Sequence, residues 1–139
     1  MRAVIDTNVL ISGLIGKTSS PAKIVDAWVA RKFQPVVSEK VIEEYSAVLT
    51  RDKFSSLGTV EERLNLLNML LSFEHVVLAS SQEKINVIQD DPQDNIFLEC
   101  AVAGGCEFVV SGARHLLQLK SYKNIKITTA IDFMLALGV

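Results

Sequence analysis

Three carboxylates of this 139-residue chain, Asp6, Glu44 and Asp94, occupy positions where acids can bind a divalent metal. Asp6 directly follows a short apolar run, and Asp94 lies near the start of an apolar helical segment. Mg²⁺ and Mn²⁺ prefer carboxylate and water oxygens, and they use only a few protein ligands. A metal held in this way polarises a phosphoryl oxygen and lowers the pKa of a bound water. The three acids therefore predict phosphodiester hydrolysis.

Each acid also has a simpler interpretation. Asp6 could serve only as the cap of the following helix, where Thr7 and Asn8 would hold it or cap that helix themselves. Glu43 fits the usual interpretation of a helical glutamate, a solvated charge, whereas Glu44 lies at the border of an apolar stripe. Acids in a first helical turn are favoured by the helix dipole without any catalytic role.

The segment before Asp94 supplies further polar groups. Asp91 is predicted to cap a helix with Pro92 at its first position, which places Asp94 on the same side of that helix start. We take Asp91 and the following Asn95 as supporting residues of the site, together with Thr7 and Asn8.

A polar loop follows the apolar run at residues 108–110. Its Ser111 is a further supporting residue, and Gly112 allows a tight turn. Arg114 and His115 could contact a phosphate, although a single histidine is more often a surface or capping residue than a general base.

These residues need a scaffold that brings them together. Apolar runs predict five strands, and helical spacing with capping signals predicts the segments between them. The predicted strands are residues 3–5, 33–37, 75–78 (an edge strand), 108–110 and 125–128. The predicted helices are residues 8–15, three that begin at Ser20, Ser38 and Thr59 (the last with a Thr59–Glu62 capping box), and residues 91–104, 116–119 and 130–137.

Strands that alternate with helices form βαβ units. We therefore expect one α/β domain over residues 1–139, with a parallel central sheet of about five strands and helices on both faces. Ligands of such sheets bind outside the carboxyl ends of the strands, where the strand order changes direction. An acid that directly follows a strand, such as Asp6, is then a candidate ligand.

Composition limits the remaining classes of function. The chain is 49% hydrophobic and 22% charged with a net charge of −2, so it lacks the basic surface of a plain DNA-binding module. Its two cysteines have no neighbouring zinc ligands and predict reduced thiols. We expect no signal peptide, because no apolar h-region follows the first residues, and no apolar stretch approaches the roughly 20 residues that span a bilayer. We expect a soluble cytoplasmic protein.

Four segments of the chain, in order and over nearly its whole length, resemble the motifs of the PIN-domain family. Each motif alone is weak, but the four in this order are specific. They are Val4-Ile5-Asp6-Thr7-Asn8-Val9-Leu10, residues 38–49 with Glu44 before Tyr45, Asp91-Pro92-Gln93-Asp94-Asn95 with the six residues after it, and Val109-Val110-Ser111-Gly112 followed by Arg114-His115-Leu116-Leu117.

The resemblance implies a metal-dependent endoribonuclease on a three-layer sandwich. Many members are toxins of toxin–antitoxin pairs, commonly dimeric and blocked by a small partner protein. It places the catalytic and metal-binding roles on Asp6, Glu44 and Asp94, with Mg²⁺ or Mn²⁺ as the cofactor. We also expect RNA contacts from four basic residues: Arg114, His115, Lys17 and Arg51.

The chain departs from the family pattern at one position. The fourth acid of the family would fall on Ala113, either because the chain is an inactivated variant or because it is a natural variant with an altered site. Both explanations predict weaker metal binding and little cleavage.

Two other classes of function remain as alternatives. A PIN-like module that binds RNA or a protein partner without cleavage is supported by Ala113 and opposed by the three retained acids. A nucleotide-binding enzyme is disfavoured, because Asp6-Thr7-Asn8 stands where a glycine-rich phosphate loop would follow the first strand.

Overall fold

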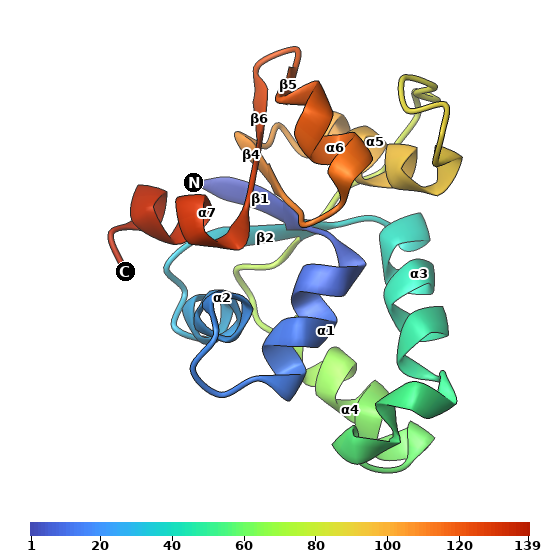
Figure 1. Ribbon diagram of the computed structural model, residues 1–139, viewed down its shortest axis with the longest axis vertical. Helices are drawn as coiled ribbons and strands as arrows, with labels where there is room; N and C mark the ends of the chain where they lie inside the picture. The colour runs from blue at the N-terminus through green and yellow to red at the C-terminus, as the bar shows by residue number, and fades with distance from the viewer.

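The computed structural model describes residues 1–139 and contains a six-stranded sheet in the order β3-β2-β1-β4-β6-β5 (Figure 1). Five strands, β3, β2, β1, β4 and β6, are parallel to one another, and β5 pairs antiparallel with β6. The strands are β1 (Arg2–Ile5), β2 (Gln34–Val37), β3 (Val77–Leu78), β4 (Phe108–Val110), β5 (Ser121–Tyr122) and β6 (Ile125–Thr128).

Helices cover both faces of this sheet. In Figure 1, α5 and α6 lie on one side, α1, α2 and α7 on the other, and α3 lies beyond the carboxyl ends of the central strands with α4 packed on it. The helices are α1 (Thr7–Ile15), α2 (Ser20–Val29), α3 (Glu39–Leu49), α4 (Val60–Leu71), α5 (Asn95–Ala103), α6 (Arg114–Leu119) and α7 (Ala130–Leu137), with short 3₁₀ turns η1 (Asp52–Leu57) and η2 (Pro92–Asp94). This arrangement confirms the predicted α/β sandwich.

Several local predictions are also confirmed. The hydroxyl of Ser38 caps α3 by accepting from Val41 N at 3.2 Å, and Thr59 and Glu62 form the predicted capping box at the start of α4. The helix over 95–103 ends at Gly104, and Gly105 follows with a φ of +61°, a left-handed conformation that suits glycine. The predicted edge strand is an edge strand, although it is only Val77–Leu78.

Two predictions about helix caps were wrong, and the sheet has one strand more than the five predicted. Ser19, not Ser20, caps α2, because its hydroxyl accepts from Ala22 N. Asp91 makes no side-chain capping bond: Pro92 begins a 3₁₀ turn, and the α-helix starts only at Asn95. The sheet has a sixth strand, β5, whose two residues are too few to produce an alternating pattern and which depends on pairing with β6.

The strand order changes direction between β1 and β4. From β1 the chain proceeds to β2 and β3 on one side, whereas β4, β6 and β5 lie on the other. The core that holds these strands is apolar, with Ala3, Val4, Val109 and Val110 fully buried in the two central strands. The crevice at this change of direction is where a ligand site is expected in such a sheet.

None of the helices is both long enough and apolar enough to cross a membrane.

Candidate active site

Asp6 lies at the change of direction between β1 and β4. Its backbone N–H continues the sheet by donating to Val110 O at 2.9 Å, and its side chain is only 3% exposed. Oδ1 accepts from Val9 N at 3.0 Å, so Asp6 is the cap of α1, as the simpler interpretation held. Oδ2 accepts a hydrogen bond from the Ser111 hydroxyl. A carboxylate has more acceptor positions than these bonds use, so Asp6 can cap α1 and still accept a further ligand.

Burial is the main influence on the ionisation of Asp6. It raises the pKa of this carboxyl, because a charge loses hydration inside the protein. The hydrogen bonds from Ser111 and from backbone N–H groups, including that of Val9, act in the opposite direction. These donors hold the carboxylate in one orientation at the strand end.

Asp94 shows that the acids from separate segments share one region. Burial and, after it, the negative charges of Asp91, Asp6 and Glu44 together raise its pKa to about 6, against an opposite effect of His115. Its Oδ2 is buried and has no hydrogen-bond partner in the protein. An unpartnered carboxylate oxygen among like charges is a group that a cation would stabilise.

Glu44 is placed by its neighbour Tyr45. The Tyr45 ring is fully buried, and its hydroxyl donates to Ile5 O, the carbonyl just before Asp6. This bond ties the middle of α3 to the end of β1. Glu44, half-buried beside it, is thereby kept near the crevice, whereas Glu43 is exposed as expected.

The donor set fits a hard divalent cation in its chemistry. It consists of carboxylates with one unpartnered buried oxygen, and the hydroxyl oxygen of Thr7, also buried and without a partner, lies next to Asp6. However, no three His, Cys, Asp or Glu side chains are close enough together to form a metal site as they stand. Side-chain movement and water ligands would have to complete the coordination of a metal.

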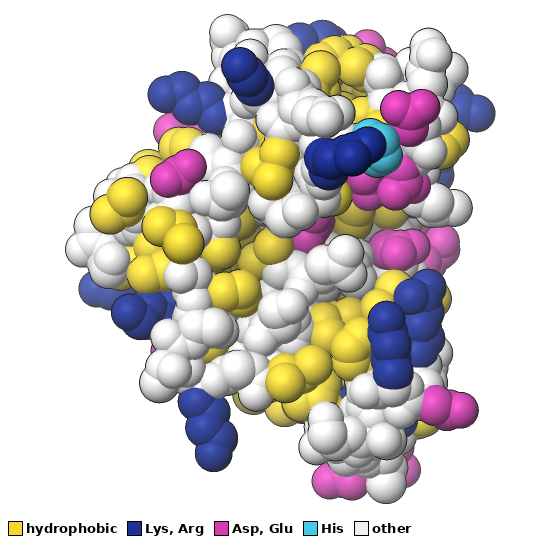
Figure 2. Space-filling view, in the orientation of Figure 1, with side chains coloured by type: hydrophobic (Ala, Val, Ile, Leu, Met, Phe, Trp, Pro, Cys, Tyr) yellow, Lys and Arg dark blue, Asp and Glu magenta, His cyan; other side chains and the backbone are white.

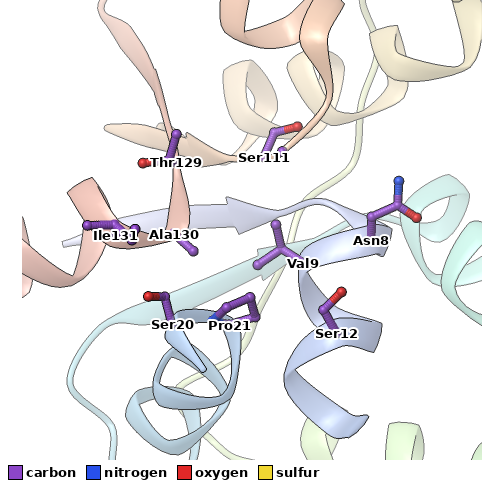
Figure 3. Close-up of a pocket in the computed structure, with 10 residues that line it drawn as sticks. Asn8, Val9, Ser12, Ser20, Pro21, Ser111, Thr129, Ala130 and Ile131 are labelled. Atoms are coloured by element: carbon purple, nitrogen blue, oxygen red, sulfur yellow. The ribbon is translucent and has the colours of Figure 1, made fainter. Parts of the chain in front are cut away.

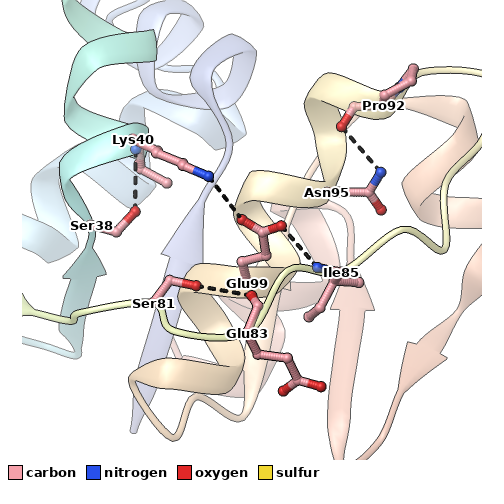
Figure 4. Close-up of polar contacts among 9 residues, drawn as sticks. Ser38, Lys40, Ser81, Glu83, Ile85, Pro92, Asn95 and Glu99 are labelled. Carbon is pink, nitrogen blue, oxygen red and sulfur yellow. Dashed lines mark hydrogen bonds and ion pairs between the residues drawn. The ribbon is translucent and has the colours of Figure 1, made fainter.

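Asn95, a predicted supporting residue, has a structural role. Its Oδ1 accepts from Val87 N and Ile88 N at 3.1 and 2.9 Å, and its Nδ2 donates to Ile88 O at 2.9 Å and Pro92 O at 3.1 Å. It thus anchors the irregular segment before Asp91 to the start of α5. Figure 4 shows its bond to Pro92 O.

The sequence analysis did not identify a second residue that anchors this segment, one turn further along α5. Glu99 is buried, its Oε2 accepts from Ile85 N at 2.9 Å, and its Oε1 lies 3.8 Å from Lys40 Nζ (Figure 4). The position of Glu99, four residues after Asn95, is the sequence signal that could have identified it. Tyr45 was likewise taken only as an apolar residue.

The four predicted basic residues do not lie together: His115 is near enough to Asp94 to lower its pKa, whereas Lys17 and Arg51 are on other parts of the chain. Arg114 and His115 begin α6 after the Ser111 loop, and His115 Nδ1 lies 3.8 Å from Asp90 Oδ2. Lys17 follows the far end of α1, about 15 Å from its start, and Arg51 lies two turns beyond Glu44. Figure 2 shows acidic side chains between the start of α3 and the region of α5 and α6.

The chain matches known proteins over most of its length. Residues 2–115 match the family described as the PIN domain. The chain is 29% identical over 121 residues to an uncharacterized protein of Methanocaldococcus jannaschii, a match that covers 86% of this chain and 76% of the relative. It also resembles the solved structure of VapBC2 from Rickettsia felis bound to a DNA fragment from its promoter. That match has a TM-score of 0.60 and 15% identity, and covers 93% of this chain and 98% of the other.

Proposed function

Because the chain belongs to the PIN-domain family, whose members are generally nucleases, we propose that it is built as a metal-dependent endoribonuclease. The observation that carries this proposal is the buried, unpartnered Oδ2 of Asp94, a carboxyl whose pKa is raised by burial and by the neighbouring charges of Asp91, Asp6 and Glu44. Carboxylates that repel one another suit a divalent cation. They lie where the strand order changes direction, which is where ligands bind in a parallel sheet.

In this proposal Asp6, Glu44 and Asp94 hold Mg²⁺ or Mn²⁺ between them. The metal, when bound, polarises the scissile phosphate and activates water. The hydrogen bonds from Val9 N and Ser111 Oγ keep Asp6 fixed, so that its remaining lone pairs point in a constant direction. Asp94 must lose its proton to bind metal, which its pKa of about 6 allows at neutral pH.

Ala113 weakens this site in our proposal. Its N–H donates to Ser111 Oγ at 2.9 Å, and that hydroxyl donates in turn to Asp6, so position 113 is one hydroxyl away from the central acid. A carboxylate at 113 would add a fourth negative ligand. The alanine leaves the loop intact and reduces affinity for the metal.

We propose the role of a toxin held by an antitoxin protein in the cytoplasm, acting on RNA as a homodimer. The support is the structural match to VapBC2, whose structure was solved bound to a DNA fragment from its promoter. The alternative is a module that binds RNA or a protein without cleaving it, and the observation that favours it is Ala113 together with the lack of a preassembled three-ligand group.

The restoring substitution Ala113→Asp tests the nuclease proposal, with Ala113→Asn as the matched neutral control. Both variants are incubated with single-stranded RNA and Mn²⁺, with and without EDTA. We expect EDTA-sensitive cleavage by Ala113→Asp that exceeds that of Ala113→Asn and of the unchanged chain, and that is lost in the double variant with Asp6→Asn. Equal inactivity of all variants, with no Mn²⁺ binding by calorimetry, would instead support the non-cleaving module.

A further inference from the structure

A second feature of the crevice between the ends of β1 and β4 lies on the side opposite Glu44 and Asp94. It is a cavity of about 370 Å³ where α1, α2, the loop after β4 and the start of α7 meet (Figure 3). Its lining residues are Asn8, Val9, Ser12, Ser20, Pro21, Ser111, Gly112, Thr129, Ala130 and Ile131. A volume of this size is in the usual range for a small-molecule site.

The cavity and the acids share a wall. Ser111 lines the cavity, and its hydroxyl donates to Asp6 Oδ2. Thr129 directly follows β6, and Ser111 directly follows β4, so the cavity opens at the same carboxyl edge of the sheet. Glu44 on α3 and Asp94 before α5 lie at the same edge, on the side away from the cavity. A ligand that crosses the edge at Asp6 would therefore meet both regions.

The chemistry of the lining selects a neutral ligand. No charged side chain lines the cavity, although the chain has 30 Lys, Arg, Asp and Glu residues. Val9, Pro21 and Ile131 contribute apolar surface. A phosphate alone would find no cationic side chain here, whereas a flat group with apolar faces would lose unfavourable contact with water.

The polar groups of the lining are suited to the edge of such a ligand. Ser111 and Thr129 are already engaged, with Asp6 and with Asp132 N, respectively. The side chains of Asn8, Ser12 and Ser20 make no hydrogen bond within the protein, and they offer both donors and acceptors. Figure 3 shows Asn8 and Ser12 on α1 and Ser20 on α2, so the free polar groups come from two helices.

We infer that this cavity binds one unpaired nucleoside of an RNA strand beside the phosphate at Asp6, and so determines base preference. The inference rests on the proposed function, which places the phosphate at the acids. Proteins read unpaired bases by hydrogen bonds to the base edges and by packing of side chains, most often aromatic ones, on the base faces. Here Val9, Pro21 and Ile131 would supply the contact with the faces.

Binding without metal tests this inference separately from cleavage. The dinucleoside monophosphates ApA, CpC, GpG and UpU are titrated in EDTA into the isotope-labelled chain and followed by NMR. We expect shifts at the amides of Asn8, Ser12 and Thr129, with dissociation constants that differ among the four probes. Shifts confined to other surfaces, or equal affinity for all four probes, would overturn the inference.

Two variants that fill the cavity from different helices give the decisive comparison. Ser12→Trp fills it from α1, and Ile131→Trp from α7, while Asn68→Trp on the exposed face of α4 is the matched control. We expect both filling variants to bind at least about tenfold more weakly, a loss of about 1.4 kcal/mol, and the control to bind normally. Unchanged binding by either folded filling variant would contradict the inference.

The two proposals fail in different ways. If Ala113→Asp cleaves RNA but no probe binds in the cavity, the nucleoside site is wrong and the nuclease proposal stands. If the probes bind in the cavity but Ala113→Asp does not cleave, the nuclease proposal is wrong and the site is one for nucleoside binding alone.

Discussion

The hydroxyl of Ser111 donates a hydrogen bond to Asp6 Oδ2 and so joins the ends of β1 and β4. Both residues are buried, at 0% and 3% exposure, and they are 105 positions apart in the sequence. The same hydroxyl accepts from Ala113 N. One side chain thus links the central acid of the site, the position of the missing acid and the wall of the neighbouring cavity.

Removal of this hydroxyl is expected to destabilise the fold. In Ser111→Ala, Asp6 loses a buried hydrogen bond to a charged group, which costs about 1.5–3 kcal/mol. The pKa of Asp6 should also rise further, because Ser111 is the largest of the influences that lower it. Urea unfolding at neutral pH measures the first effect. The exposed Ser56→Ala is the control and should change stability by less than about 0.5 kcal/mol. Equal stabilities of the two variants would contradict the role of the bond.

Asp94 predicts a pH dependence of stability in the metal-free protein. Its pKa is raised from 3.8 to about 6, so between these values the native state holds the proton more tightly than the unfolded state does. The contribution of this residue to stability therefore falls as the pH rises through that window and stays low above it. Asp94→Asn, which stays neutral, should gain stability relative to the unchanged chain above pH 6 and lose that advantage near pH 4.

Denaturant titrations of both proteins across this range provide the measurement. Asp132→Asn, at an exposed position in α7 away from the acids, serves as the control. A difference between Asp94→Asn and the unchanged chain that is constant with pH would show that Asp94 titrates normally.

Metal binding should compete with protonation of Asp94. Below a pKa of about 6 the carboxyl is increasingly protonated, so the affinity for Mn²⁺ should fall by up to about tenfold for each pH unit. The increase of the melting temperature on addition of Mn²⁺, compared at about pH 7 and pH 5, measures this loss, and EDTA should reverse it. Ala113→Asp should show a larger increase than Ala113→Asn. An increase that is the same at both pH values would exclude Asp94 as a ligand.

Asn95 should keep the segment before Asp91 and Asp94 in its folded conformation. Asn95→Ala removes four hydrogen bonds to Val87, Ile88 and Pro92, the two to Ile88 fully buried, and we expect a loss of about 2–4 kcal/mol in stability. Limited proteolysis should cut within residues 79–91 more readily in this variant. Asn86→Ala, at an exposed position of the same segment whose side chain makes no hydrogen bond within the protein, is the matched control and should resist proteolysis as the unchanged chain does.

The sequence determined the strands and helices whose signals are local. The apolar runs at residues 3–5 and 108–110 and the caps Ser38 and Thr59 act within a few residues of where they stand, so the pattern alone locates them. The motif around Asp6 also sufficed to place that residue at a strand end. By contrast, β5 depends on pairing with β6, and the 3₁₀ turn before α5 depends on the segment that Asn95 and Glu99 anchor. The sequence did not reveal either element.

Only the tertiary structure decided what surrounds the acids. The bond from Ser111 to Asp6, the anchoring of α3 by Tyr45 on Ile5 O and the fastening of residues 85–88 by Glu99 and Asn95 all join distant segments. The same holds for the raised pKa of Asp94 and for the cavity beside Ser111. Burial and the approach of like charges arise only when the chain is folded, because each depends on neighbours that the sequence holds far apart.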